Sequence, residues 1–415
     1  MEVMTVSKLE DLIQELCQNG VEYKCFGEMA TIVRGASPRP IKNFITTNAD
    51  GVNWIKIGDV KPGSKYIFET VEKITPDGAK KSRFVKEGDF ILSNSMSFGR
   101  PYIMKTQGCI HDGWLAISHF DNHFISDFLY HLLNSNTYQQ EMRKKASFGG
   151  AVQNLNADIV RNLKMPVVPL PIQREIVRIL DNFTELTAEL TAELTARKKQ
   201  YEYYRKYFYE LIKQKGTGVV CIKDVCDLLT GYPFDSSKFT HNGIHLLRGM
   251  NIKRGTLDYS ESNNRYWNSS HGYEKFMLSI DDIVIAMDGS LVGKSYAQVK
   301  DEHLPSLLVQ RVARVRATKA NAHYVYHYIS SGAFTQYVEK KKTSGAVPHI
   351  SLKDIANFMI PLPSGDMQKE ISDILDRFDT LCNDLTSGLP AEIEARQKQY
   401  EYYRDKLLTF KEASV

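Results

Sequence analysis

The amino-acid sequence predicts an α+β fold in which two globular α/β modules, related by an approximate twofold axis, are separated by two long antiparallel coiled-coil helices. Three observations support this prediction. The 415 residues exceed one comfortable hydrophobic core and suit two domains. The heptapeptide KQYEYYR occurs at residues 199–205 and again at 398–404. From Ile172 onward, apolar side chains recur in steps of four and three residues, which is the periodicity of a coiled coil.

The first predicted element is an amphipathic helix within residues 1–24. Its acidic residues stand where a secretory signal would carry positive charge, so export is not expected. The stretch LEDLIQELC at residues 9–17 resembles KYFYELIKQ at residues 206–214, which precede the second module. We therefore expect the N-terminal helix to pack near the C-terminal helix and to complete the approximate symmetry.

The two predicted modules cover residues 25–170 and 216–365. They match each other at an offset near 195, and FLYHLLNS at 128–135 aligns with YVYHYISS at 324–331. Short strand-like runs and one helix near the end of each module predict a strand-rich α+β domain. Both of these helices end in lysines followed by glycines. The helix macrodipole explains such lysines, and contact with a phosphate is the alternative.

The two long helices are predicted at residues 171–215 and 366–412. The second is expected to break near 387–390, where Gly388 and Pro390 occur. In the first helix, the TAELTAEL stretch adds one extra step of four, which is a stutter in the heptad pattern. The natural partner for each apolar stripe is the other stripe. We therefore expect antiparallel rods with one module at each end.

The repeated heptapeptide distributes aromatic side chains over two faces of each helix. Core packing in the seam between the helices is expected for Tyr201, Tyr204, Tyr400 and Tyr403. The remaining aromatic and arginine side chains are expected to face outward, where they suggest a docking surface for another protein. That second set consists of Tyr203, Arg205, Tyr402 and Arg404.

Composition limits the class of protein. No apolar run approaches the ~18 residues of a membrane span, so a soluble, cytoplasmic protein is expected. The six cysteines form no CxxC pair, which favours reduced, inert thiols and no structural metal. The pairs His119/His123 and His323/His327 have helical metal spacing but lack a third ligand, and a structural or surface role is expected. A net charge of +4 is compatible with nucleic-acid binding without demonstrating it.

Polar and basic loops recur at matched positions in both modules. They are RGASPRPIKNF (34–44), SNSMSFGRPY (93–102), GYPFDSSKF (231–239) and AMDGSLVGKS (286–295). Arginine, lysine, serine, asparagine and aspartate are the residues that grip phosphates and read base edges, although each loop taken singly also fits an ordinary solvated loop. The candidate DNA contacts are Arg39, Lys42, Ser97, Arg100, Lys238, Arg248, Ser290 and Lys294.

Motifs of catalysis are absent from the sequence. DGSLVGKS resembles a phosphate-binding loop, but Asp288 stands where the first glycine is required. The chain has no GxGxxG after a strand, no GxSxG elbow, no HExxH helix and no Asn-Pro-Pro-aromatic signature of an adenine methyltransferase. The sequence therefore predicts a protein without a catalytic site of its own.

Taken together, these segments resemble the specificity subunits of type I restriction-modification systems over essentially the whole chain. The resemblance rests on GGAVQNLNADIVRNLKMPVVPLPIQREIVRILDNF from Gly149 and SGAVPHISLKDIANFMIPLPSGDMQKEISDILDRF from Ser344. It also rests on the TAEL repeats, both KQYEYYR segments, NSMSFGRPYI and MDGSLVGKS.

The resemblance implies two target recognition domains, each of which reads one half of a bipartite, double-stranded DNA target. It also implies assembly with two modification subunits, which bind S-adenosylmethionine and methylate adenine, and with restriction subunits, which cleave DNA using ATP and Mg²⁺. No cofactor is expected in this chain. The TAEL repeat is expected to act as a ruler for the spacer between the half-sites. A coiled-coil scaffold or tether that joins protein partners without touching DNA is the alternative, and an enzyme in its own right is disfavoured.

Overall fold

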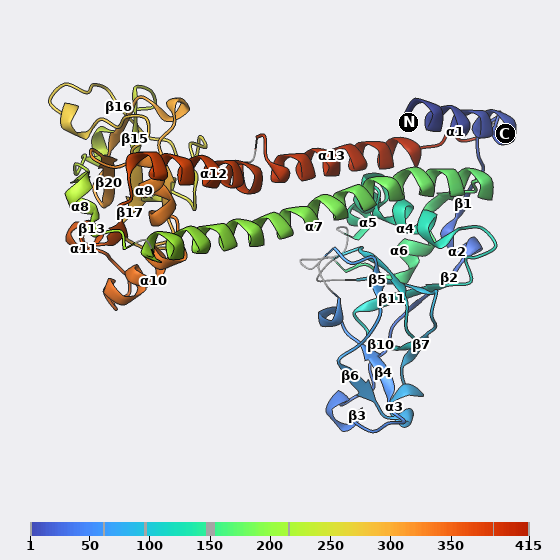
Figure 1. Ribbon diagram of the computed structural model, residues 1–415. Coiled ribbons are helices and arrows are strands. Elements are labelled where there is room, and N and C mark those ends of the chain that lie inside the picture. The colour runs from blue at the N-terminus through green and yellow to red at the C-terminus, as the bar shows by residue number, and fades with distance from the viewer. Residues whose placement is uncertain are drawn as a thin grey trace. The chain divides into compact units, whose positions relative to one another are not determined.

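The structure is a computed structural model of the chain and describes residues 2–60, 63–94, 98–146, 154–214, 216–384 and 386–413. The chain forms two compact units. Unit 1 comprises residues 1–189 and 394–415, and unit 2 comprises residues 190–393. Each unit holds one module of mixed α and β structure together with parts of the long helices (Figure 1).

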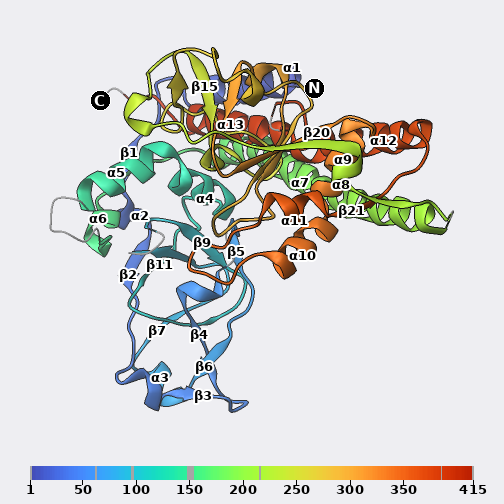
Figure 2. The ribbon, with the colours of Figure 1, turned by 90° about the vertical axis from the view of Figure 1, so that its left-hand side faces the viewer.

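Module 1 contains two five-stranded sheets (Figure 2). The first has the order β2-β11-β8-β9-β5 and lies beneath the helices α4, α5 and α6, whereas the second has the order β3-β6-β4-β10-β7. The strands of the first sheet are β2 Thr31–Arg34, β11 Trp114–Ser118, β8 Phe90–Ser93, β9 Pro101–Met104 and β5 Tyr66–Ile67. Those of the second are β3 Ile45–Thr46, β6 Glu72–Ile74, β4 Val52–Ile55, β10 Gly108–Ile110 and β7 Arg83–Val85.

Module 1 also contains short helices and a pair of short strands. Asn156 caps α6, because its side chain accepts a hydrogen bond from the backbone N–H of Ile159. The elements are β1 Tyr23–Cys25, α2 Phe26–Met29, η1 Ile41–Asn43, η2 Ile57–Asp59, α3 Pro76–Ala79, α4 Ser126–Asn134, α5 Asn136–Ala146, α6 Ala157–Arg161 and β12 Lys164–Pro166, with β1 paired to β12.

Module 2 repeats this plan with shorter sheets. The order β14-β20-β17-β18 corresponds to β2-β11-β8-β9, and the order β16-β15-β19 corresponds to β6-β4-β10. Both second sheets contain the same parallel pair, β4 with β10 and β15 with β19. The strands are β13 Val219–Cys221, β14 Cys226–Thr230, β15 Ile244–Leu247, β16 Tyr266–Trp267, β17 Ile283–Ala286, β18 Tyr296–Gln298, β19 Ser306–Leu308, β20 Val312–Ala317 and β21 Met359–Pro361.

The helices of module 2 begin at polar caps. The side chains of Asn321, Ser331 and Ser351 accept hydrogen bonds from the first turns of α9, α10 and α11. The helices are α8 Ile222–Val225, α9 Ala322–Ile329, α10 Gly332–Lys341 and α11 Leu352–Ala356, and the 3₁₀ turns are η4 Ser236–Lys238, η5 Gly249–Asn251, η6 Glu274–Phe276 and η7 Asp301–His303. The shared topology confirms that the two modules are copies of one fold.

The first long helix, α7 (Leu170–Gln214), runs 45 residues and contributes to both units. Pro171 lies in its first turn, and Gly216 beyond its end has a φ of 66°. The extra step of four is present but lies earlier than expected, because Leu186 is exposed and Thr187 takes the less exposed position, so that the steps from Ile179 to Phe183 and from Phe183 to Thr187 are both four. From Phe183 the stripe advances in steps of four and three through Thr187, Leu190, Leu194, Arg197 and Tyr201, all partly or fully buried, and Gln200 beside Tyr201 is partly buried too.

The second long helix is divided into α12 (Gly365–Asn383) and α13 (Leu389–Leu407). The Asp384 carboxylate accepts hydrogen bonds from the backbone N–H groups of Thr386 and Ser387. These two bonds stabilise the turn between the helices. Gly388 belongs to this turn. Pro390 instead lies in the first turn of α13, where its missing N–H costs little. The break was predicted at residues 387–390 and begins three residues earlier.

The long helices pair within each unit. In unit 2, Tyr201 and Tyr204 of α7 pack on Phe378 of α12, whereas Phe208 further along α7 lies with Ile371 of α12. Rising residue numbers on α7 therefore meet falling numbers on α12, so these segments run antiparallel. In unit 1, Phe183 of α7 stacks on Tyr403 of α13 with ring centroids 5.3 Å apart.

The N-terminal helix α1 (Glu2–Leu16) belongs to unit 1. Leu9 is buried in the same cluster as Leu408, which follows α13, and Lys8 forms a 3.1 Å ion pair with Glu175 of α7. Val21 continues the contact through a parallel bridge to Glu412. Among the described residues, no helix is long and apolar enough to cross a membrane.

Candidate nucleic-acid interface and the helix junctions

A buried histidine joins module 1 to the long helices of unit 1. His131 of α4 lies between Asp181 of α7 and Tyr400 of α13. Its Nε2 is 3.0 Å from an Asp181 carboxylate oxygen, and its Nδ1 is 2.9 Å from the Tyr400 hydroxyl. A carboxylate only accepts, so Nε2 carries the proton and Nδ1 accepts from the tyrosine. Burial lowers the pKa of His131 and raises that of Tyr400 to about 12, which keeps both groups neutral.

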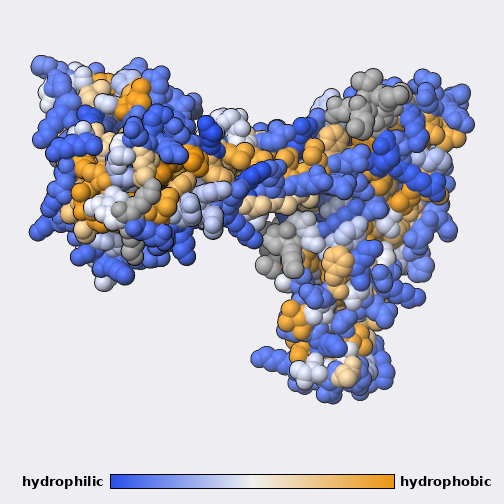
Figure 3. All heavy atoms as spheres, viewed as in Figure 1, coloured by the Kyte–Doolittle hydropathy of each residue, from blue (hydrophilic) through white to orange (hydrophobic). Residues whose placement is uncertain are grey.

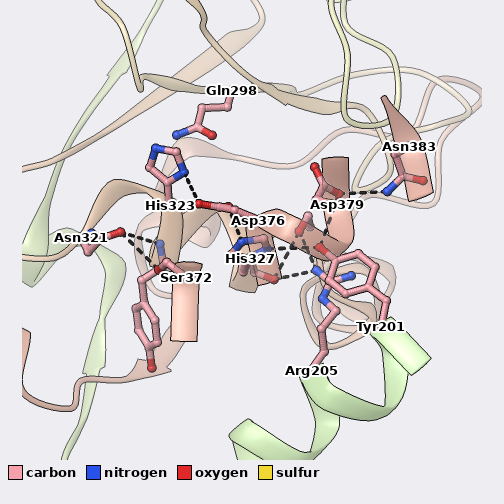
Figure 4. A network of polar contacts seen from close by, with 12 residues as sticks. Tyr201, Arg205, Gln298, Asn321, His323, His327, Ser372, Asp376, Asp379 and Asn383 are labelled. Atoms are coloured by element: carbon pink, nitrogen blue, oxygen red, sulfur yellow. Dashed lines mark hydrogen bonds and ion pairs between the residues drawn. The ribbon is translucent and has the colours of Figure 1, made fainter. Parts of the chain in front are cut away.

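Unit 2 contains the same junction at the matching positions (Figure 4). The Nε2 of His327 in α9 is 2.7 Å from Asp376 of α12, and its Nδ1 is 3.2 Å from the Tyr201 hydroxyl of α7. Burial again lowers the pKa of the histidine and raises that of the tyrosine. Asp376 also holds His323, whose Nδ1 lies 2.8 Å away, and this second histidine distinguishes unit 2 from unit 1.

These junctions explain why the heptapeptide is repeated. Its first tyrosine, Tyr201 in one copy and Tyr400 in the other, reaches the buried histidine of a module helix and ties that helix to α7 or α13. The four tyrosines expected in the seam between the helices lie inward: Tyr201 is buried, and Tyr204, Tyr400 and Tyr403 are partly buried.

The expected outward position of the two arginines is wrong. The side chain of Arg205 is only 12% exposed, and its Nη2 donates 2.7 Å to the carbonyl of His327. The side chain of Arg404 is 9% exposed and contacts Asp405. Each arginine follows a junction tyrosine by four residues, so both lie on the same face of the helix, and each guanidinium lies over that tyrosine ring.

The two remaining residues of the suggested docking surface are exposed. Tyr203 is 64% and Tyr402 is 62% exposed. Tyr203 stacks on Tyr207 one turn further along α7, with centroids 6.2 Å apart, and Lys406 lies over the ring of Tyr402. Docking of a partner at these residues stays a prediction.

Replacing His323 with glutamine is expected to weaken unit 2 more at pH 6 than at pH 8. Asp376, and next Asp281, raise the pKa of His323 in the folded protein. The charge interaction therefore stabilises unit 2 fully below the unfolded pKa of about 6.5 and is lost as pH rises through the folded pKa. Urea unfolding of both proteins at pH 6, 7 and 8 measures this difference, and a difference that does not change with pH would contradict it.

Several candidate contacts of module 1 lie at one edge of its first sheet. β2 and β8 both run antiparallel to β11, so the ends of β2 and β8 meet the beginning of β11. Arg39, in the loop after β2, is exposed and pairs with Asp112 at 3.2 Å. Arg100 is exposed in the loop after β8. Lys42 is exposed in η1, where its neighbours Ile41 and Phe44 pack on the second sheet instead. Ser97 lies outside the described residues.

Module 1 also exposes large apolar side chains. Figure 3 shows apolar patches among hydrophilic ones on the part of the module that contains β3, β4 and β6. Aromatic side chains at such positions are able to stack on bases or to pack against a partner protein. The exposed large apolar residues of module 1 include Ile45, Phe68, Val71 and Phe84.

The candidate contacts of module 2 divide into exposed and inward-facing side chains. Ser290 and Lys294 are exposed in the loop after β17, and Lys238 is exposed at the end of η4. Arg248 is half-buried, and its Nη2 donates 2.6 Å to the carbonyl of Asn263. Burial, and next the neighbouring Arg265, lower the pKa of Arg248. The Arg248 guanidinium thus binds the backbone of its own module. The composition of its loop did not indicate this inward position.

Sequence analysis missed the acidic residues that hold the exposed arginines. Asp112 binds Arg39 and Ser37 in module 1. Asp288 binds Arg311 and His349 in module 2. In the sequence, Asp288 stands only as the residue that replaces the first glycine of a phosphate-binding loop, and no local motif marks Arg311. Among the described residues, no group of three or more potential ligands is placed to hold a metal ion.

The fold and these contacts define a class of two-module protein in which diverged α/β modules are fixed to long paired helices by duplicated junctions. A family model described as the type I restriction modification DNA specificity domain matches residues 18–197 and 214–395. The chain belongs to this family.

Individual relatives agree with the family assignment. The Escherichia coli type I restriction enzyme EcoR124I/EcoR124II specificity subunit is 39% identical over 259 residues, which cover 59% of this chain and 61% of that protein, less than two thirds of its length. A Haemophilus influenzae protein named as a type I restriction enzyme specificity subunit is 26% identical over 94% of this chain and 96% of its own. The solved S subunit from M. genitalium, 15% identical, has the same fold with a TM-score of 0.57 and coverage of 94% and 96%.

Proposed function

We propose that this chain is the non-catalytic DNA-recognition subunit of a type I restriction-modification complex. Each module reads one half of an asymmetric, bipartite target in double-stranded DNA. The observation that carries the proposal is one shared topology in which an arginine held by aspartate at the same sheet edge comes from a different segment in each module, Arg39 with Asp112 in one and Arg311 with Asp288 in the other. Two readers of one fold that present their arginines from different segments fit two different half-sites.

The proposed assembly assigns the chemistry to partner subunits. Two modification subunits would bind S-adenosylmethionine and methylate adenine, and restriction subunits would use ATP and Mg²⁺. Docking of the modification subunits is assigned to the long helices, with Tyr203 and Tyr402 as exposed anchors. The test for docking is co-purification of the modification subunit with wild-type chain and with the double variant Tyr203→Ala/Tyr402→Ala.

Binding to DNA tests the proposal against a protein-only tether. A gel shift with random duplex, carried out with the chain alone and with its modification subunit, is expected to show binding that weakens as salt rises, because lysine and arginine contacts release counterions from phosphates. Absence of salt-sensitive binding in both samples would favour the tether.

Deleting Thr191–Leu194 is expected to change the preferred gap between the half-sites while leaving both half-site sequences intact. These four residues lie on α7 between its contacts in unit 1 and unit 2, and they account for about 6 Å of rise and about 40° of rotation. Mapping of methylated adenines in cells that carry the complete system measures the gap. A variant of unchanged length, Thr191→Ala/Glu193→Gln, is the control, and an unchanged gap in the deletion variant would refute the ruler.

A further inference from the structure

Three segments of module 2 meet around Asp288, at the sheet edge where β17 ends and β20 begins. The Met287 N–H donates to the carbonyl of Arg311, and the Ile350 N–H donates to the carbonyl of Met287. The Gly289 N–H donates 3.0 Å to the carbonyl of Pro348. The loop after β17, the turn before β20 and the segment before α11 are therefore held together by backbone hydrogen bonds.

The Asp288 carboxylate binds one side chain from each of the other two segments. One oxygen lies 2.7 Å from Nη1 of Arg311, and the other lies 2.5 Å from Nδ1 of His349. The carboxylate is 18% exposed, whereas the Arg311 side chain is 67% exposed. The salt bridge therefore holds the guanidinium at Nη1, while the rest of the group faces solvent.

The solvent-facing part of this guanidinium has the donors needed to read a base. Within the part of the chain that the structure describes, Nη1 is the only atom of the Arg311 guanidinium with a polar partner, which leaves Nε and Nη2 available. A guanidinium presents paired donors that match O6 and N7 of guanine in the major groove. Arg311 also has a φ of 67°, a conformation that few non-glycine residues adopt and that often marks functional sites.

We propose that Arg311 reads a guanine in the half-site bound by module 2, and that Asp288 and His349 are the positioning residues that fix its guanidinium. This inference rests on the proposed function. The salt bridge restricts the Arg311 side chain in the free protein. Binding to DNA therefore costs less side-chain conformational entropy. Exposed lysines on the same loop and on the end of α10, namely Lys294, Lys340 and Lys341, supply the charge that attracts phosphates.

Module 1 supports the assignment with a different set of residues. Asp112 precedes β11 and holds Arg39, which is 81% exposed, with Nη2 on one carboxylate oxygen and the Ser37 hydroxyl on the other. Here the acid comes from the turn and the arginine from the loop after β2, whereas in module 2 the arginine comes from the turn. Both modules thus hold an exposed arginine by a carboxylate at the same sheet edge, but the two arginines start from different strands.

The substitution Arg311→Lys tests the inference, because it keeps the charge and removes the planar fork of donors. The full chain assembled with its modification subunit is used to select duplexes from a randomised library, and the selected sequences give the preference at each position. We expect the preference for guanine to fall about tenfold or more at one position of one half-site. The base preferences in the other half-site and the affinity for non-specific duplex are expected to stay within about twofold of the wild-type values.

Two further variants separate the outcomes. Asp288→Asn is expected to relax the same position, because it weakens the tether of the guanidinium, whereas a purely structural salt bridge would change thermal stability and affinity without changing that position. Arg377→Lys, an exposed arginine on α12, is the matched control and should leave every position unchanged. Unaltered preferences in Arg311→Lys, or an equal shift in Arg377→Lys, overturn the inference. Wild-type chain that selects no sequence overturns the proposed function itself.

Discussion

Replacing Asp376 with alanine is expected to lower the free energy of unfolding by about 2–3 kcal/mol at neutral pH. Asp376 accepts from Nε2 of His327, whose side chain is buried, and from His323. Removal of the carboxylate leaves a buried N–H without an acceptor and releases α9 from α12. Urea unfolding followed by circular dichroism measures the change, and hydrogen exchange of α9 locates it.

The neighbouring Asp373 provides a matched control on the same helix. Its carboxylate pairs with Lys369 at 2.8 Å, and both side chains are at least half exposed. An exposed pair one turn apart contributes little, so Asp373→Ala should change the free energy of unfolding by less than about 0.5 kcal/mol. Equal effects of the two substitutions would show that the junction does not stabilise the fold.

Replacing Gly231 with alanine is expected to destabilise module 2 by about 3 kcal/mol. A Cβ at this position would lie 2.2 Å from the carbonyl oxygen of Val309 and 2.5 Å from that of Leu308. Both contacts are with backbone, which cannot rotate away. Module 1 repeats the arrangement, because a Cβ on Gly35 would lie 2.1 Å from the carbonyl oxygen of His111. Thermal unfolding of Gly231→Ala measures the loss.

Gly249 is the control for this steric prediction. The nearest atom to a Cβ at Gly249 is the Ala286 Cβ at 3.8 Å, which is ordinary van der Waals contact. Gly249→Ala should therefore stay within about 0.5 kcal/mol of wild type. Equal stability of Gly231→Ala and Gly249→Ala would contradict the prediction. It would mean that the chain after β14 lies further from the carbonyl groups at the end of β19 than the structure shows.

Much of the fold follows from the internal repeat and the heptad pattern. An offset of 195 aligns Asp181 with Asp376, and an offset of 196 aligns FLYHLLNS with YVYHYISS, so the Asp and His of both junctions are already paired in the sequence. Their significance was missed because a histidine on an apolar helix face gives no signal of its partner. The combination of a duplicated histidine, aspartate and tyrosine, each within an apolar pattern, was the available clue.

The inward position of Arg205 could also have been predicted, because it follows Tyr201 by one helical turn. The Asp288 site could not. Its carboxylate, arginine and imidazole come from residues 288, 311 and 349, which only the pairing of β17 with β20 and the backbone contacts of the loops bring together. Loop composition drew attention to Ser290 and Lys294, which lie on the same loop as Asp288, but not to Arg311 and His349, which Asp288 binds.

The division of the chain into a continuous and a discontinuous unit bears on how the protein is made. Unit 1 needs residues 394–415, since Leu408 is buried in its core and Tyr400 binds His131. On the ribosome, module 1 emerges first, but these residues follow only after all of unit 2, a delay of roughly 10–40 s at about 5–20 residues per second. The half that is translated first is thus completed last, and in the interval the apolar surface that residues from α13 onward cover is exposed to solvent.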